Sequence, residues 1–298
     1  MRRLLLLLSL VAAGCLDPAL ASPRPFSVES KSNPSGFATI TGPLFTEDAL
    51  QLSTDGVDEF VDCTGIWEEV FGEAAATKLT VIHWYSSKPQ PNDRTLDVAY
   101  AGSSASGAGA GGGIEFITLG ADRIAPYLNS SAATLPTYQW WSATSNTQAL
   151  TFDGTQGVDT DRADNWHRLD AETVFTHKVQ TDYSIAASVD FSTTGSNTGY
   201  TFVIPGQTGG GSVSDLPAYK IGSLAIWVGE TLTLAQLNEA ILADKPTDLN
   251  AHSVGPPEFW LRMGDGGDAA PATTLTNFGS AGGTCSGVNL EAGDFISW

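Results

Sequence analysis

The sequence predicts an all-β fold, a jelly-roll sandwich of two antiparallel sheets with one short helix. Apolar and polar residues alternate with a period of two along most of the chain, which is typical of strands. Clusters of Gly, Asn, Asp and Ser separate these runs, as turns do in sandwiches and jelly rolls. With 298 residues, 42% of them hydrophobic, the chain can bury one large core, and we expect a single domain.

The first residues are predicted to be a signal peptide. An arginine pair precedes the apolar run 4–13, and Ala-Leu-Ala at 19–21 fits the pattern that signal peptidases cut. We therefore expect residues 1–21 to be removed and 22–298 to form the domain. The apolar run is too short for a transmembrane helix, and no later run is long enough. An alternative cut before Cys15, in a sequence that resembles a lipoprotein box, would leave a lipid-anchored protein.

Two cysteines remain on either route. Cys15 is removed or lipidated, so Cys63 and Cys285 are left in an oxidising compartment, where we expect them to form a disulfide. The alternative is two isolated buried thiols. Either way, the predicted location is outside the cell or on its surface.

The formal net charge of −19 excludes some partners. Nucleic acids and anionic membrane surfaces need a basic footprint, so neither is an expected partner. An acidic surface mainly aids solubility and can gather cations.

Most predicted elements are strands. In KLTVIHWYSS, Leu79, Val81, His83 and Tyr85 alternate with Thr80, Ile82 and Trp84, and the segment is predicted to be a strand covered on both faces. The other predicted strands span 49–52, 59–63, 96–101, 114–118, 137–143, 149–152, 185–191, 200–204, 220–228 and 259–263. Between two of them, the Gly- and Ser-rich stretch 102–113 is predicted to be a flexible loop.

One helix is predicted, at about 233–244. Thr233 and Gln236 have the spacing of a capping box, and Pro246 follows the end. An apolar stripe runs along one side, formed by Leu234, Leu237, Ile241 and Leu242. We expect this helix to pack on an edge or end of a sheet.

The loop after 259–263 has the spacing of a dinucleotide fingerprint, G-x-G-x-x-A at 264–269. That motif binds a pyrophosphate only where its glycines open a helix. No helical periodicity follows, and the stretch 271–277 is rich in threonine. We interpret the match as accidental, with Gly264, Gly266 and Gly267 supplying a tight turn.

Catalytic motifs are not evident in the sequence. The four histidines are scattered without zinc spacing, and there is no nucleophile elbow or Cys-x-x-Cys motif. The E-x-D-x-x-E spacing of β-sandwich glycosidases is also missing. Asp170 and Glu172 would share a strand face but fit a polar turn equally well. The sequence therefore predicts a protein that is not an enzyme.

Two kinds of binding residue are candidates. Three carboxylates in the stretch GVDTDRADNW could bind calcium, and they are Asp159, Asp161 and Asp164. The alternative is a solvated acidic loop, and Asp265 with Asp268 is a weaker pair. For sugars, TYQWWSA places Tyr138 and Trp140 on one strand face and Trp141 on the other, so that one ring could face outward. Ordinary sheet packing is the alternative for each ring.

Several stretches resemble laminin G-like, concanavalin A-like domains. ALQLSTDGVDEFVDC (49–63) resembles the opening strand pair of that family, and KLTVIHWYSS its next core strand. Residues 219–249 resemble its strand, capped helix and polar exit. FWLRMGDGG and the later NLEAGD, within 259–295, are similar to a segment found in laminin G-like proteins of tailed phages and marine bacteria. The resemblance covers most of 45–296 but not its middle, 102–211, so loop ligands there are not carried over.

The resemblance implies a curved antiparallel jelly roll. It also implies a non-catalytic function, such as adhesion, glycan binding or surface assembly. The expected partner is a polysaccharide or another subunit of a surface or virion assembly. A phage capsid or tail protein is one alternative, and a glucanase or lyase of the same superfamily is another. The segment that usually comes first in the family comes last here, at 254–298, as in a circular permutation. We expect it to pack beside the first strands, with the disulfide locking this closure; in a rival arrangement the tail completes a neighbouring subunit's sheet.

Overall fold

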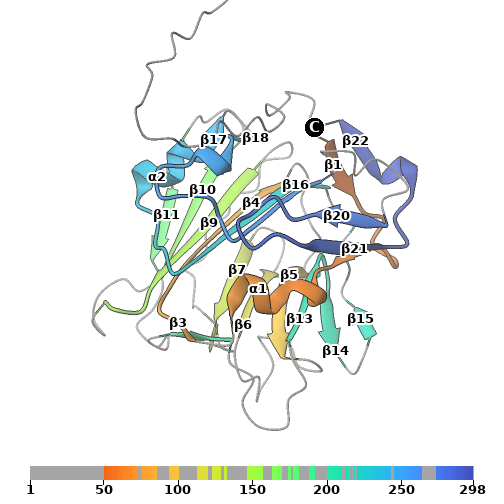
Figure 1. Cartoon of the computed structure of the whole chain (residues 1–298), viewed down its shortest axis with the longest axis horizontal. Coiled ribbons are helices and arrows are strands. Elements are labelled where there is room, and N and C mark those ends of the chain that lie inside the picture. Colours follow the sequence, from red (N-terminus) through yellow and green to blue (C-terminus); the bar gives the residue numbers. More distant parts are fainter. Residues whose placement is uncertain are drawn as a thin grey trace, which may run out of the picture. The chain divides into compact units, whose positions relative to one another are not determined.

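The computed structural model describes residues 50–72, 75–85, 94–100, 113–119, 123–128, 131–132, 146–156, 163–169, 174–175, 177–180, 188–191, 200–209, 212–214, 216, 218, 220–242, 245–263 and 273–297. All of them belong to one compact unit, Gly42–Trp298; the other unit is Met1–Thr41. The described residues form two antiparallel sheets with short helices, which confirms the predicted all-β sandwich (Figure 1).

The first sheet contains eight described strands, and every pairing in it is antiparallel. Its central strand, β16 (Lys220–Val228), pairs with β4 along one edge. The other edge of β16 is shared, because Ile221 pairs with β1 and Ser223–Ile226 pair with β19. The remaining order is β11 (His177–Gln180), β10 (Ala163–Leu169), β9 (Asn146–Asp153), β4 (Lys78–Tyr85), β16, β1 (Leu50–Ser53) and β22 (Phe295–Ser297), with β19 at Phe259–Arg262.

The second sheet also contains eight described strands, all antiparallel. Its order is β20 (Thr274–Thr276), β21 (Thr284–Val288), β2 (Phe60–Asp62), β13 (Tyr200–Ile204), β5 (Arg94–Tyr100), β6 (Gly113–Leu119), β7 (Arg123–Leu128) and β8 (Ser131–Ala132). Three further pairs are β3 (Ala75–Ala76) with β12 (Val189–Asp190), β14 (Gln207–Gly209) with β15 (Ser212–Ser214), and β17 (Ile241–Leu242) with β18 (Lys245–Pro246). The helices are η1 (Thr64–Ile66), α1 (Trp67–Phe71), α2 (Leu234–Glu239), η2 (Leu249–Ala251) and η3 (Ala292–Asp294).

The main core joins the two sheets. Alternate residues of β4, Leu79 and Val81, belong to the same buried cluster as Ile114 and Phe116 of β6 in the other sheet. A second cluster contains the intervening residues of β4, Ile82 and Trp84, together with residues of α2 and the segment after it. Strand β4 is therefore covered on both faces, as its sequence predicted.

The predicted helix forms, but it is shorter than expected. Its capping box is present, since the Thr233 hydroxyl accepts from the Gln236 N–H and the Gln236 side chain accepts from the Thr233 N–H. The helix ends at Glu239, so the prediction of helix to residue 244 is wrong. The physical reason is that the Ala240 carbonyl accepts from the Thr247 N–H at 3.0 Å, which turns the chain into the β17–β18 pair.

The C-terminal segment packs beside the first strands. Strand β22 pairs with β1, and β21 pairs with β2, as the sequence led us to expect. Figure 1 shows β22 beside β1, near the marked C-terminal end. Within the threonine-rich stretch, Thr274–Thr276 form strand β20. Within the described part of the chain, no helix combines the length and apolar character needed to cross a membrane.

Candidate functional site

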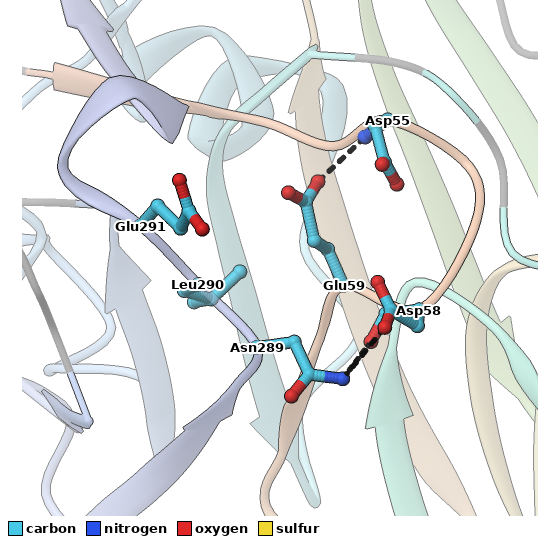
Figure 2. Close-up of a pocket in the computed structure, with 6 residues that line it drawn as sticks. All are labelled: Asp55, Asp58, Glu59, Asn289, Leu290 and Glu291. Atoms are coloured by element: carbon cyan, nitrogen blue, oxygen red, sulfur yellow. Dashed lines mark hydrogen bonds between the residues drawn. The ribbon is translucent and has the colours of Figure 1, made fainter.

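An acidic cleft lies where the beginning and end of the domain meet. It has a volume of about 560 Å³ and is lined by two connections, the one between β1 and β2 and the one that follows β21. Figure 2 shows the side chains of both connections around the same space. The lining residues are Asp55, Asp58, Glu59, Asn289, Leu290 and Glu291.

Hydrogen bonds within the first connection fix its shape. The Asp55 carboxylate accepts from the Val57 N–H at 2.7 Å, and the Glu59 carboxylate accepts from the Asp55 N–H at 2.6 Å. Gly56 has a φ of +79°, and a Cβ at that position would lie 2.8 Å from the backbone nitrogen of Ala218. Only glycine fits both the backbone conformation and the space. The turn therefore holds its carboxylates in place.

Asn289 joins the two connections. Its side-chain amide donates to the carbonyl oxygen of Asp58 at 3.2 Å and to the carboxylate of Asp58 at 3.0 Å (Figure 2). Its φ of 56° lies in the left-handed region, which asparagine tolerates better than most residues. Just beyond, the Glu291 N–H donates to the Asp294 carboxylate. The two turns that form the cleft are thus joined by the hydrogen bonds from Asn289 to Asp58.

All the charged side chains that line the cleft are acidic. Burial raises the pKa of Glu59, and the nearby carboxylates of Asp294, Asp55 and Asp58 raise it further against the lowering effect of the Asp55 N–H bond. The Glu59 side chain is 8% exposed, whereas Asp55 and Asp58 are exposed. Such a surface attracts cations and hydrogen-bond donors, and it repels anions.

The described residues do not by themselves provide a metal centre. Among them, no group of three His, Cys, Asp or Glu side chains is arranged to hold a metal ion. The predicted calcium ligands Asp159 and Asp161 lie outside the described residues, and Asp164 is a half-buried residue of β10. Only one residue of the predicted calcium triad, Asp164, is therefore among the described residues.

The predicted sugar-binding aromatics also lie outside the described residues; these are Tyr138, Trp140 and Trp141. The same is true of Asp170, Glu172, Asp265 and Asp268 and of the glycines at 264, 266 and 267. Three of the described histidines are buried: His83, His167 and His252. Burial lowers the pKa of the His83 imidazole to about 3, and His252 lies 3.0 Å through Nε2 from the Gln236 carbonyl oxygen.

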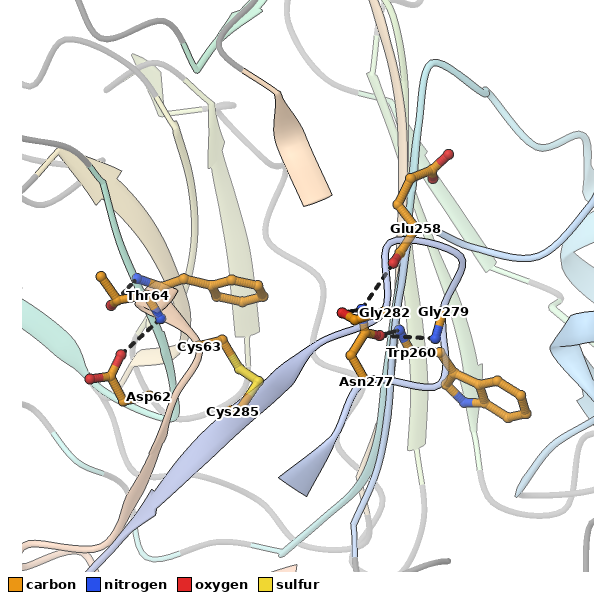
Figure 3. The surroundings of a disulfide bond; sticks show 10 residues. Asp62, Cys63, Thr64, Glu258, Trp260, Asn277, Gly279, Gly282 and Cys285 are labelled. Atoms are coloured by element: carbon orange, nitrogen blue, oxygen red, sulfur yellow. Dashed lines mark hydrogen bonds between the residues drawn. A yellow bond between two sulfur atoms is a disulfide. The ribbon is translucent and has the colours of Figure 1, made fainter. Parts of the chain in front are cut away.

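The predicted disulfide is present at the end of the β2–β21 pair that lies away from the cleft. Cys63 follows β2 and Cys285 lies in β21, the strand paired with β2, and their sulfur atoms are bonded (Figure 3). Both cysteines are almost fully buried in the main core. The bond links positions 222 residues apart, so it ties the end of the domain to its beginning. A buried disulfide of this kind is expected of a protein from an oxidising compartment.

Sequence reasoning missed the cleft, although its residues stood in stretches that carried the resemblance. DGVDEF at 55–60 was interpreted as part of a strand pair, and NLEAGD at 289–294 as a family phrase. The sequence did contain a signal for the cleft. Both stretches are acidic, and they lie in segments that were expected to pack together. Their convergence depends on the pairing of β2 with β21.

Comparisons with known proteins give distant similarities. No protein-family model matches the chain, and no curated protein matches it. The native heptameric SAP-like pentraxin of Limulus polyphemus is similar with a TM-score of 0.40 at 12% identity, over 65% of this chain and 82% of that chain. The CBM40 of the Ruminococcus gnavus IT-sialidase is similar with a TM-score of 0.38 at 13% identity, over 64% of this chain and 97% of that chain. Similarities at this level carry no conclusion about ligand or activity.

Proposed function

We propose that this protein is a non-catalytic extracellular binding module and that the acidic cleft binds a neutral polysaccharide. The observation that carries the proposal is the lining of the cleft, an open space of about 560 Å³ edged by carboxylates and one amide. Sugar hydroxyls are hydrogen-bond donors, and ionised carboxylates are strong acceptors that can receive two such bonds. Leu290 adds one apolar side chain to the lining.

The charge of the cleft selects among polysaccharides. Four of its six lining residues are acidic, and the chain carries a formal net charge of −19. A uronic or sulfated polymer would be repelled, whereas a neutral or amino-substituted one would not. We therefore propose a neutral, hydroxyl-rich ligand.

Binding fits the cleft better than hydrolysis does. A glycosidase needs one carboxyl to donate a proton and a second to attack or activate water. Glu59 instead accepts from the Asp55 N–H, and Asp58 accepts from Asn289, so both carboxylates hold the turns together. The bond from the Asp55 N–H favours the ionised form of Glu59, whereas a general acid must carry a proton.

A glycoside hydrolase is the second candidate, and one observation favours it. Glu59 has a raised pKa beside other carboxylates in an open cleft, which is the condition that a general acid requires. Release of reducing sugar from neutral polysaccharides that disappears in Glu59→Gln would establish this candidate. Binding without release of sugar supports the module.

The predicted aromatic residues and calcium ligands extend the proposal. Tyr138, Trp140 and Trp141 would stack on sugar rings as a second contact, since flat apolar rings pack on pyranose faces. Calcium, if bound, would be held by Asp159, Asp161 and Asp164. A melting temperature that rises with calcium over chelator, and no longer rises in Asp161→Asn, is the expected result. Lipid anchoring through Cys15 would keep the module at the cell surface.

The experiment is a glycan array probed with the wild-type protein and matched variants. Asp58→Ala removes a lining carboxylate, and Glu69→Ala removes an exposed carboxylate of α1 that does not line the cleft. We expect wild type and Glu69→Ala to bind the same neutral glycans and Asp58→Ala to lose that signal. Equal binding by all three proteins would contradict the assignment to the cleft. Trp140→Ala with Trp141→Ala tests the aromatic contact separately.

A further inference from the structure

Basic and polar side chains form a row across the first sheet, on the face that packs against α2. Residues that pair directly on neighbouring strands point to the same face of a sheet. From β19 through β16, β4 and β9 to β10, each member of the row pairs with the next, and the members are Arg262, Ser223, Trp84, Thr147 and Arg168. We call these five residues the basic row. All of them are buried, and the two arginines at its ends are 8% and 0% exposed.

The indole N–H of Trp84 differs from those of the other tryptophans on this face. The indoles of Trp166, Trp227 and Trp260 each donate to an oxygen atom at 3.1 Å. Trp84 is fully buried, and within the described part of the chain nothing accepts from its Nε1–H. Buried donors in native proteins are nearly always paired with protein, water or an ion. The Trp84 indole therefore indicates a bound acceptor.

The two neighbours of Trp84 in the basic row form hydrogen bonds with other groups. The Ser223 hydroxyl accepts from the Trp260 indole and donates to a backbone carbonyl oxygen at 3.0 Å. The Thr147 hydroxyl accepts from Nε of Arg168 at 3.2 Å. Since Thr147 lies between Trp84 and Arg168 in the row, this bond holds the guanidinium on the side of β10 that faces Trp84.

Arg262 is held at the other end of the row by two aromatic rings. Its guanidinium carbon lies 5.1 Å from the ring centroid of Trp260 and 4.9 Å from that of Phe278. Stacking of this kind fixes the plane of a guanidinium, whose N–H donors lie at the edge of that plane. The basic row thus combines an indole donor with two positioned positive charges. Burial of such charges is costly unless a negative charge lies nearby.

We propose that the basic row binds a small inorganic anion, such as chloride, which accepts from the Trp84 Nε1–H and from the guanidinium of Arg168. An anion supplies acceptors and negative charge together, as an indole donor and buried arginines require. A water molecule would bring two donors of its own and no charge. Because all five residues are buried, the ligand is an ion of few atoms and not a polysaccharide. The site shares no residue with the acidic cleft and does not depend on its proposed function.

Thermal melting of the intact protein tests the site when chloride replaces gluconate at constant ionic strength. The wild-type melting temperature should rise by at least about 2 °C and then saturate, because a ligand that binds only the native state stabilises it. Trp84→Phe keeps an aromatic ring but removes the N–H, and it should lose most of this rise. Trp227→Phe is the matched control, since it removes a buried indole N–H from the same cluster but outside the row. It should keep the rise.

Bromide gives a second readout, because its anomalous scattering identifies it in a crystal. We expect a bromide peak within hydrogen-bonding distance of Trp84 Nε1 in the wild type and none there in Trp84→Phe. The wild-type peak decides the question even where Trp84→Phe does not fold. Equal chloride responses in all three proteins would overturn the proposal. So would a water molecule, or a carboxylate of the chain itself, at Nε1 in place of bromide.

Discussion

Two asparagines in the C-terminal segment, Asn277 and Asn289, have opposite surroundings. Asn277 is 4% exposed, and its side-chain oxygen accepts from the N–H groups of Trp260 and Gly279 at 2.8 and 2.9 Å. Its amide nitrogen donates to the carbonyl oxygens of Glu258 and Gly282 at 3.2 and 2.8 Å. Figure 3 shows these backbone groups around the one side chain.

Asn289 is exposed and has one partner residue, Asp58, within a group of carboxylates. Both asparagines connect distant backbone segments. The buried one satisfies groups that water cannot reach, whereas the exposed one leaves acceptors open to solvent. The difference indicates that the Asn277 region stabilises the fold, whereas the Asn289 region is open to solvent, as the proposed binding site requires.

The largest expected effect is at the buried asparagine. Asn277→Ala would leave two N–H and two C=O groups without this partner, and we expect the free energy of unfolding to fall by about 4 kcal/mol. Asn250→Ala, at an exposed asparagine of η2, should change it by less than about 0.5 kcal/mol. Urea denaturation of both variants measures the contrast. Equal losses would remove the distinction between buried and exposed asparagines.

Removal of the disulfide should have the second-largest effect on stability. Cys63→Ala with Cys285→Ala should lower the free energy of unfolding by about 2 to 5 kcal/mol, because the bond restricts the unfolded chain. Adding a reductant should shift the wild-type denaturation curve towards that of the double variant. The double variant itself should not respond to reductant. A wild-type curve that reductant leaves unchanged, under conditions that reduce the bond, would contradict the role of this closure.

Acid sensitivity is the third effect. His83 is buried, with a pKa of about 3 against 6.5 in the unfolded chain, so the unfolded state binds the proton first. Its contribution to stability is therefore complete above pH 6.5 and is lost progressively as the pH falls towards 3. Between pH 7 and 5, the wild type should lose about 2 kcal/mol more than His83→Gln. Parallel pH profiles for the two proteins would contradict the burial of a neutral imidazole.

The smallest effect is in the cleft. Because burial and neighbouring carboxylates raise the pKa of Glu59, its ionised form opposes folding at neutral pH. Glu59→Gln removes that charge and keeps an oxygen to accept from the Asp55 N–H, so the melting temperature at pH 7 should rise slightly. The gain should vanish at low pH, where Glu59 is protonated. Glu69→Gln serves as the exposed control, and a lower melting temperature in Glu59→Gln would show that its charge is stabilising.

Much of the fold followed from sequence periodicity. The strands 200–204 and 220–228 have the bounds that were predicted, and β4 has its two covered faces as expected. These segments are continuously apolar or alternate cleanly, so burial and pattern agree. The predicted strand 137–143 lies outside the described residues, and so do 185–187 of the predicted strand 185–191, of which Val189–Asp190 form β12.

Strands with polar or proline-containing sequences were missed. Strand β10 contains Asp164, Asn165, His167 and Arg168, and the last three are buried. Gln148 donates to Asn165 at 2.9 Å and Arg168 donates to Thr147 at 3.2 Å, so residues of β9 are partners for part of this polar surface. Strand β7 includes Pro126, which usually argues against a central strand. It lies next to the sheet's last described strand, the two-residue β8. Tertiary partners, which a local pattern does not contain, explain both cases.

The cleft could not be predicted for a related reason. Asp58 and Asn289 are 231 positions apart, and their contact depends on sheet register together with a left-handed backbone at Asn289. The disulfide was predictable because compartment and cysteine count left one pair. The number of cysteines was enough to predict the disulfide, whereas the acidic cleft at the other end of the β2–β21 pair is evident only in the folded chain.

Calorimetric titration of a neutral oligosaccharide, with melting temperatures of the same samples, tests whether the acidic cleft binds sugar. We expect Asp58→Ala and Glu291→Ala to weaken binding at least about tenfold, or about 1.4 kcal/mol, with little change in melting temperature. Asn250→Ala should alter neither quantity, and a matched uronic oligosaccharide should bind more weakly than the neutral one. Unchanged affinity in both cleft variants, or tighter binding of the uronic ligand, would show that the acidic cleft is not the site of a neutral sugar.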